Sequence, residues 1–287
     1  MNGPTQNDEQ APPTPLTALR FGLDPIPTRD LCHYTSQDGL IGILNHKSMY
    51  ATDSAYLNDS QEIVYAVNLA KKYFKNRRTP QRSLPLLAML HLLDQTESVV
   101  GKMPAYVASF SEEPDLLSQW RGYCSKGSGF ALCLSPDRMT KIVKAHEWTL
   151  FKCIYDEGQQ IEVLRTIEKD AISFHESGMS PPLQTFARTL LGLSIVLKHP
   201  KFKEESEWRA VRRFGVTPSI RPGASTLVPY TNFPLTVTPR DSVELSGLVV
   251  GPTPHAPLAL RAAQCLLQKT STICPEPISS EIPFRDW

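Results

Sequence analysis

Apolar residues recur at two spacings along the chain, and these predict a mixture of helices and strands. Spacings of three and four, typical of amphipathic or buried helices, occur in residues 39–47, 63–74, 84–100, 115–123, 158–177, 182–198 and 257–269. Short apolar or alternating runs, typical of strands, occur in residues 105–111, 129–135, 149–156, 207–214 and 243–251. The two kinds follow one another irregularly, which favours an α+β fold over a doubly wound parallel sheet.

Polar residues mark where two of these helices should begin. Ser36 precedes residues 39–47 and can accept a hydrogen bond as an N-cap. Asp59 and Glu62 have capping-box spacing ahead of residues 63–74. Both positions therefore predict a helix start.

The prolines set the expected boundaries. Six of the 25 prolines fall within the first 27 residues, which predicts a disordered leader over residues 1–28 and a single α+β domain over 29–287. Eleven prolines follow position 215, so residues 215–239 should be loop-rich, with at most edge strands.

Composition and charge exclude several classes of protein. With 41% hydrophobic and 21% charged residues, the chain is globular, and its net charge of +1 gives no global signal for nucleic acid. No apolar run reaches the roughly 18 residues of a membrane span, and the N-terminus does not resemble a secretory signal. We therefore expect a cytoplasmic protein with no membrane partner.

The six cysteines are scattered and form no C-x-x-C pair, so we expect buried free thiols and no zinc site. The P-loop, Rossmann, nucleophile-elbow and H-E-x-x-H motifs are also missing. Their absence argues against P-loop nucleotidases, Rossmann dehydrogenases, α/β-hydrolases and zincins.

Two polar clusters lie in the N-terminal half. His33, at a predicted junction of strand and helix, can donate to a ligand hydroxyl or simply fix the turn. Thr52, Asp53, Tyr56 and Asn58 form the second cluster, for which turn formation is the alternative to ligand binding.

Two further clusters involve aromatic and charged residues. Ser109 and Ser111 precede Trp120 and Tyr123, which could line a flat pocket for a ring or pack at helical spacing. In a strand through residues 205–209, Glu205, Glu207 and Arg209 share one face, opposite a buried Trp208. The charged face suggests a polar ligand site or a surface row of ion pairs.

Five ordered motifs resemble a known prokaryotic family. They are HYTS, ATDSAYLNDSQE, SFSEEPDLLSQWRGY, GFALCLS and HPKFKEESEWR, and the chain closes with VVGP and ISSEIPFR. Together they are similar to the family called domain of unknown function 2971, over about residues 31–285. That name implies no activity.

A second resemblance does imply an activity. His33 and Thr35 match the His-x-Thr that binds the adenosine ribose in ADP-ribosyltransferases, and Glu207 matches their glutamate beside the nicotinamide ribose. Glu205 with Glu207 is similar to the E-x-E of arginine-directed members. This similarity implies that Glu205 and Arg209 face the molecule that receives ADP-ribose. The resemblance implies a compact α+β domain with a mixed, mostly antiparallel split sheet flanked by helices.

The resemblance also implies a set of ligand contacts. The tyrosine that stacks on nicotinamide matches Tyr50, Tyr56 or Tyr123, and we expect Tyr123 to be catalytic together with His33 and Glu207. The remaining predicted NAD contacts are Tyr34, Thr35, Tyr56, Ser109 and Trp120. We expect His33, a central tyrosine and Glu207 to converge within about 12 Å in one pocket.

The implied reaction is transfer of ADP-ribose from NAD, as substrate, to a protein or nucleic acid, without a metal. A carboxylate would stabilise the cationic ribose as nicotinamide leaves. A toxin or phage-defence role and a neutralising partner protein would suit such an enzyme.

Two alternatives remain open. The first is a non-catalytic module that binds a ligand or nucleic acid. The second is an effector that acts on nucleic acid, for which Lys201, Lys203, Arg209, Arg212 and Arg213 would form a basic strip. A metal-dependent nuclease would have only Asp53, Asp59 and Glu62 as candidate ligands.

Overall fold

The computed structural model describes residues 26–57, 60–77, 90–91, 93–94, 104–124, 129–176, 192, 195–212, 216–223 and 225–283. Its strands are β1 (Leu31–Ser36), β2 (Ser48–Asp53), β3 (Tyr106–Ser111), β4 (Gly129–Leu134), β5 (Thr149–Lys152), β6 (Glu207–Arg212), β7 (Ser219–Pro222), β8 (Leu227–Pro234), β9 (Gly247–Val250) and β10 (Ile278–Ser279). Its helices are α1 (Gln37–His46), α2 (Ser60–Asn76), α5 (Leu117–Tyr123), α6 (Pro136–Ala145), α7 (Glu157–Glu176) and α9 (Ala256–Lys269), with short 3-10 turns η2 (Ser54–Tyr56) and η4 (Pro200–Glu205).

The strands join in one mixed sheet, as expected for an α+β fold. Its order is β10-β9-β4-β1-β3-β2-β8-β7, and β6 lies between β3 and β5. β9 and β10 pair in parallel, whereas the other named strands pair antiparallel. The predicted α+β class and mostly antiparallel sheet are therefore confirmed.

The sheet divides along one edge of β3. β6 pairs with β3 over its whole length, from Tyr106 to Ser111. On the other edge β2 pairs only at Tyr106 and Val107, and β1 pairs only at Ser111. Residues 108–110 therefore have no strand partner on that edge, and β1 and β2 diverge there. We call this divergence the fork; α1 connects its two arms.

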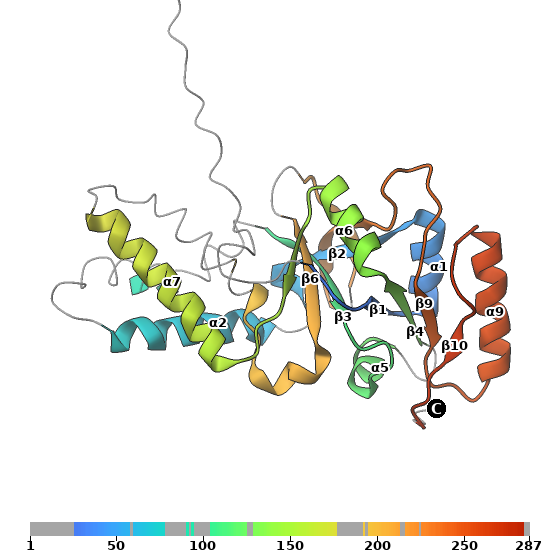
Figure 1. Cartoon of the computed structure of the whole chain (residues 1–287), viewed down its shortest axis with the longest axis horizontal. Coiled ribbons are helices and arrows are strands. Elements are labelled where there is room, and N and C mark those ends of the chain that lie inside the picture. Colours follow the sequence, from blue (N-terminus) through green and yellow to red (C-terminus); the bar gives the residue numbers. More distant parts are fainter. Residues whose placement is uncertain are drawn as a thin grey trace, which may run out of the picture.

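Two hydrophobic clusters cover the two faces of the sheet around the fork. Phe110 and Trp208 point into the larger cluster, with α1, α6 and α9. Val107 and Val211 point to the opposite face, where α2 and α7 pack side by side at one end of the molecule (Figure 1). No described helix combines the length and apolar character needed to cross a bilayer.

Strand alternation therefore places the polar residues of β3 and β6 on the same side as α2 and α7. Ser109 pairs with Arg209, and Ser111 pairs with Glu207. Trp208 has only 2% of its surface exposed, so its predicted burial on the opposite face is confirmed.

Local chemistry explains how β1 passes into α1. The Ser36 hydroxyl accepts a hydrogen bond from the Gly39 amide at 3.1 Å, which confirms the predicted N-cap. The second expected cap, Asp59, lies outside the described residues, as does the Glu62 side chain.

Most strongly patterned elements appear where expected, with three departures. Strand β2 and helix α6 were not predicted, because SMYATD is too polar for a strand pattern and α6 follows β4 almost directly. Eight-residue β8 pairs with both β2 and β7, so residues 215–239 hold more than edge strands. The predicted leader up to residue 25, and most of the predicted helices 84–100 and 182–198, lie outside the described residues.

The structure also corrects the expectation for two cysteines. Cys32 on β1 is directly opposite Cys133 on β4, with a Cα–Cα distance of 4.0 Å, and the two form a disulfide. Cys124, Cys153, Cys265 and Cys274 are free. The disulfide joins residues 101 positions apart, a pairing that only the strand register brings together.

Candidate functional site

A cavity of about 1030 Å³ opens at the fork, and we call it the fork cavity. Its wall is built by β1, α1, β2, β3, α5 and β6, together with β7 and β8. A narrower recess at the β3–β6 side is lined by His33, Tyr123, Glu205 and Glu207, among others. Three residues predicted to converge, His33, Tyr123 and Glu207, thus border the same recess.

His33 bridges the two strands where they do not pair. Its Nδ1 lies 3.0 Å from the carbonyl oxygen of Ser109, so Nδ1 carries the proton and donates it. Burial lowers the pKa of His33 to about 4, and the ring is therefore neutral at pH 7. Its Nε2 is then an acceptor. His33 would accept a hydrogen bond from a ligand hydroxyl, whereas the sequence suggested that it would donate one.

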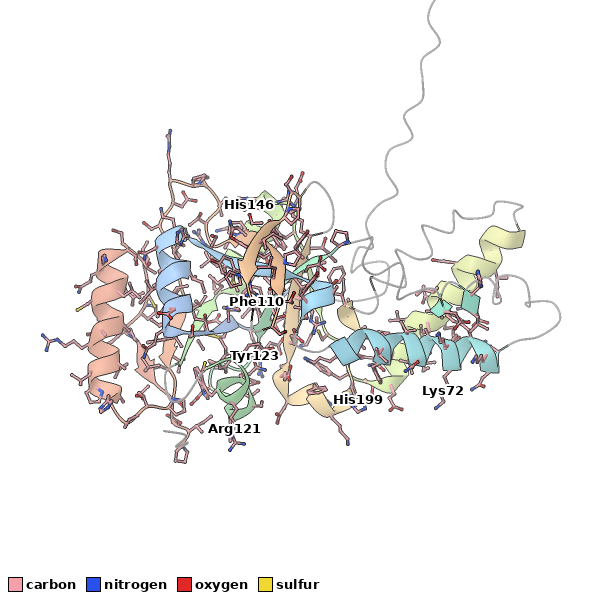
Figure 2. The ribbon with its side chains drawn as sticks, turned by 180° about the vertical axis from the view of Figure 1, so that it is seen from behind. Lys72, Phe110, Arg121, Tyr123, His146 and His199 are labelled. Carbon is pink, nitrogen blue, oxygen red and sulfur yellow. A yellow bond between two sulfur atoms is a disulfide. The ribbon has the colours of Figure 1, made fainter. Side chains whose placement is uncertain are left out.

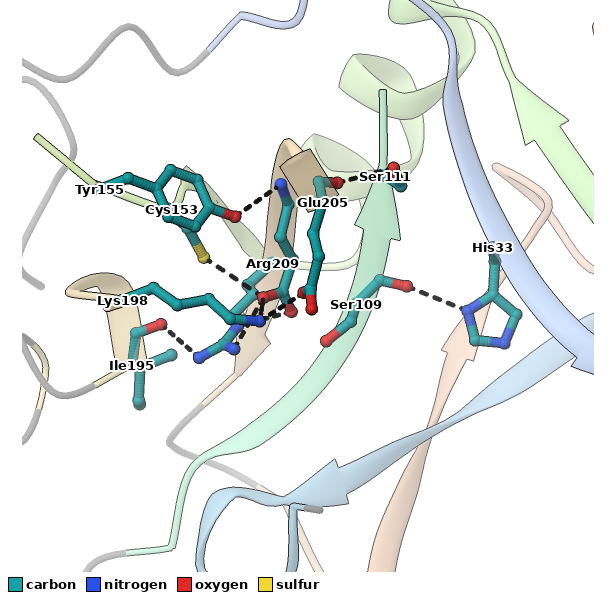
Figure 3. Close-up of polar contacts among 10 residues, drawn as sticks. His33, Ser109, Ser111, Cys153, Tyr155, Ile195, Lys198, Glu205 and Arg209 are labelled. Atoms are coloured by element: carbon teal, nitrogen blue, oxygen red, sulfur yellow. Dashed lines mark hydrogen bonds and ion pairs between the residues drawn. The ribbon is translucent and has the colours of Figure 1, made fainter. Parts of the chain in front are cut away.

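Glu207 and Arg209 form a bidentate pair on β6. Figure 3 shows Arg209 beside Lys198 in this cluster of polar side chains. Arg209 Nε donates to Glu207 Oε1 at 2.8 Å, and Arg209 Nη2 donates to Oε2 at 2.8 Å. Lys198 Nζ donates to the same Oε2 at 2.8 Å. All three side chains are buried, so this is an interior charge network and not the surface row of ion pairs suggested by the sequence.

Further contacts fix the position of Glu207. Its amide donates to the Tyr155 hydroxyl at 3.0 Å, and its carbonyl accepts from the Cys153 amide at 2.9 Å. The Cys153 thiol also points at Oε2, at 3.7 Å. Both carboxylate oxygens therefore already have donors.

The network keeps Glu207 ionised. Burial would raise its pKa, but the positive charges and hydrogen bonds of Arg209 and Lys198 outweigh burial and lower the pKa to about 2. At neutral pH the carboxylate is charged, and two cations compensate that charge.

Glu205 does not lie on the strand, contrary to the expectation from alternation. It ends η4, and Ser206 follows in the left-handed region with φ of 42° before β6 begins. Its carboxylate nevertheless lines the fork cavity and accepts from Lys198 Nζ at 2.6 Å. The Glu205 side chain is 17% exposed against 8% for Glu207, so it has more access to a ligand.

Tyr50, Tyr56 and Tyr123, the three candidate tyrosines, are exposed and all line the fork cavity. Only Tyr123 also borders the recess with His33 and Glu207. Loss of water around its hydroxyl, and then the negative charge of Glu207, raise the pKa of Tyr123. Tyr123 lies in the central part of the molecule, whereas Lys72 marks the distant α2 end (Figure 2).

Among the other predicted NAD contacts, Thr35 and Ser109 line the fork cavity. Tyr34 does so too, but its hydroxyl already donates to the Glu113 carbonyl at 2.6 Å and accepts from the Leu116 amide at 2.9 Å. The Tyr34 hydroxyl is thus engaged in holding the segment before α5.

Trp120 requires a correction. It is 2% exposed and does not line the fork cavity; its ring centroid lies 4.6 Å from that of Tyr34. Its Nε1 donates to Asp115 at 2.7 Å. Packing, the alternative to ligand binding that the sequence left open, therefore accounts for Trp120, with Tyr34 of β1 as its aromatic partner.

The predicted basic strip is also wrong in part. Arg209 is buried and bonded to Glu207, whereas Lys201 and Lys203 lie exposed on η4. Arg213 lies outside the described residues. In the part of the chain that the structure describes, no three His, Cys, Asp or Glu residues are grouped as metal ligands.

Two cations of the cavity wall were missed by sequence reasoning, Lys198 and Arg221. Lys198 is the last residue of the predicted helix 182–198, and a bridge between Ile154 and Leu197 attaches this end of the segment beside β5. Arg221 stands in the proline-rich segment predicted to be loop. No local motif marks either residue.

Comparison with known proteins gives one family match. Residues 119–210 match the family model described as Protein of unknown function (DUF2971). Comparisons with curated proteins and with solved structures gave no match. The similarity to ADP-ribosyltransferases therefore rests on the short motifs alone. The resemblance to domain of unknown function 2971 is confirmed over residues 119–210, between α5 and β6.

Proposed function

We propose that the fork cavity binds NAD, and that transfer of ADP-ribose is the reaction which this binding serves. The observation that carries the proposal is that His33, Tyr123 and Glu207 border one recess although they come from β1, α5 and β6. A cavity of about 1030 Å³ is at the upper end of the size range of small-molecule sites.

The wall offers one partner for a ribose of NAD and one for its nicotinamide ring. Nε2 of the neutral His33 would accept a hydrogen bond from a ribose hydroxyl, while Nδ1 keeps its hydrogen bond to the Ser109 carbonyl. The exposed ring of Tyr123 would stack on nicotinamide at the mouth of the recess. Such contacts would orient the glycosidic bond before it breaks.

In the proposed reaction the bond between the ribose carbon and the nicotinamide nitrogen breaks, and nicotinamide leaves with the electron pair. A nucleophile of a protein or nucleic acid then forms the new bond at the same carbon and gives up its proton to water. Glu205 and Glu207 supply negative charge beside the developing cation. Because Lys198 contacts both carboxylates, its position would decide how much of that charge the ribose feels.

Binding without turnover is the second candidate, and a specific observation favours it. Both oxygens of Glu207 accept hydrogen bonds from Arg209, and Oε2 also accepts from Lys198. A carboxylate compensated in this way stabilises a cation less than one whose charge is unopposed. If the hydrogen bonds of Arg209 and Lys198 to Glu207 persist when NAD binds, the site would hold NAD without cleaving it.

The test measures NAD affinity and NAD consumption on the same preparations of the wild type, Glu205→Gln and Glu207→Gln. Transfer predicts that the wild type consumes NAD when an acceptor is present, and that one glutamine variant loses about 10²–10³ in rate. NAD binding without consumption by any acceptor would favour the second candidate. Absence of binding would contradict both.

A further inference from the structure

Arg221 reaches across the sheet into the fork cavity. It starts on β7, yet its Nη2 donates to the Thr52 hydroxyl of β2 at 3.1 Å, on the far side of β8. Its guanidinium carbon lies 5.5 Å from the centroid of the Tyr50 ring. Contacts with Thr52 and Tyr50 therefore fix the guanidinium on the wall formed by β2.

Arg221 differs from Arg209 and Lys198, the other strong cations of the cavity wall, in its ion-pair partners. Arg209 and Lys198 each contact Glu207. For Arg221, no carboxylate of the described residues lies within ion-pair distance, and its remaining contact is a 3.5 Å hydrogen bond to the Pro222 carbonyl. Arg221 therefore brings to the cavity wall a positive charge without an ion-pair partner among the described residues, whereas the charges at Glu207 compensate one another.

One nitrogen of Arg221 also lacks an acceptor. Its Nε is buried and has no hydrogen-bond partner. A buried donor without a partner is unusual in folded proteins and calls for a missing acceptor. Nη1 and Nη2 each carry a second N–H beyond their bonds to Pro222 and Thr52, and two guanidinium N–H groups match two oxygens of one phosphate group.

A pair of aromatic rings lies beside the guanidinium: Arg221 lies over the Tyr50 ring, and Tyr230 packs on Tyr50. The Tyr50 and Tyr230 ring centroids are 4.3 Å apart, and both residues line the fork cavity. The guanidinium lies near β2, two strand spacings or about 10 Å from β6. An elongated ligand could therefore contact Arg221 and the recess at Glu207 together.

We infer that Arg221 is an anion subsite of the fork cavity and binds the phosphate groups of a nucleotide, with Tyr50 and Thr52 holding the guanidinium in place. The choice of NAD as that nucleotide rests on the proposed function. The anion subsite itself rests on the charges of the cavity wall: Lys198 and Arg209 are paired with Glu207, whereas Arg221 has no carboxylate partner among the described residues.

The test compares Arg221→Gln, which removes the charge, with Arg221→Lys, which keeps it, and with Arg240→Gln as a matched exposed control. Calorimetric titrations use NAD, adenosine and inorganic pyrophosphate, and thermal melting confirms that each variant is folded. We expect Arg221→Gln to weaken NAD and pyrophosphate binding by about 10- to 100-fold, with Arg221→Lys intermediate. Adenosine binding and the Arg240→Gln variant should match the wild type. Equal NAD affinity of wild type and Arg221→Gln would overturn the subsite.

Pyrophosphate separates failure of the subsite from failure of the proposed function. If the wild type binds pyrophosphate and Arg221→Gln does not, the subsite stands even when NAD fails to bind. If the wild type binds neither, the subsite is overturned together with the nucleotide site.

Discussion

Arg209 donates two hydrogen bonds of 2.8 Å to Glu207, two residues before it on the same face of β6. The pair is buried, and Arg209 also donates to the Ile195 carbonyl at 2.8 Å. The glutamate matched to a catalytic residue is thus also the anchor of an interior charge network.

The first prediction concerns the stability of that network. Glu207→Gln should lower the free energy of unfolding by about 3–5 kcal/mol, because Arg209 then keeps its charge in the interior without a compensating carboxylate. Glu205→Gln should cost less than half as much, since Lys198 retains Glu207. Urea unfolding of the two variants checks this, and equal losses would contradict the network.

The second prediction concerns pH. The pKa of His33 falls from 6.5 to about 4 on folding, so the neutral form stabilises the fold above pH 6.5. This contribution, at most about 3 kcal/mol, should be lost as the pH falls from 6.5 to 4. The contribution of Glu207, whose pKa is lowered from 4.5 to about 2, should be lost only between those two values.

Urea unfolding of the wild type and His33→Gln at several pH values separates the two groups. The variant should show a smaller loss between pH 6.5 and 4 and the same loss below pH 4. Parallel curves over the whole range would show that His33 is not the group responsible.

The third prediction concerns Trp208, which packs in the larger core. Its Nε1 donates to Glu112 at 2.7 Å. Trp208→Ala should lower the free energy of unfolding by about 3–5 kcal/mol through the lost packing. Trp208→Phe keeps most of the apolar contact and should cost clearly less. A mild effect of the alanine variant, measured by denaturant unfolding, would be inconsistent with the burial described.

The fourth prediction compares two glycines of α1. A Cβ at Gly39 would collide with the Thr35 hydroxyl, whereas a Cβ at Gly42 meets nothing within 4 Å. Gly39→Ala should therefore destabilise the protein by about 1–3 kcal/mol and displace Thr35 from the cavity wall. Gly42→Ala should stabilise it by up to about 1 kcal/mol through helix propensity. The melting temperature of Gly42→Ala should therefore lie above that of Gly39→Ala, and the reverse order would contradict the contacts described for α1.

Sequence patterns sufficed where a local feature determines the structure. Alternation predicted the burial of Trp208 in its strand, and the hydroxyl of Ser36 predicted the start of the following helix. Strand β2 escaped prediction because only Met49 and Ala51 face the core, whereas Ser48, Tyr50 and Thr52 line the fork cavity. Cys32 and Cys133 likewise become partners only through the pairing of β1 with β4.

The candidate site was predictable only as separate motifs. His33 and Glu207 stood out by residue type, but Lys198 and Arg221 reach the cavity through long-range packing that no local spacing encodes. The left-handed turn at Ser206 removed Glu205 from the strand, and sequence alternation cannot foresee such a turn.

Direct titration of NAD into the wild type and His33→Ala, followed by calorimetry at pH 7, tests the central claim most directly. If NAD binds in the fork cavity against His33, the wild type should bind one NAD per chain saturably, and the variant should bind at least tenfold more weakly because a buried hydrogen bond to the ribose is lost. Absence of wild-type binding, or equal affinity of both proteins, would contradict the claim that NAD binds in the fork cavity against His33.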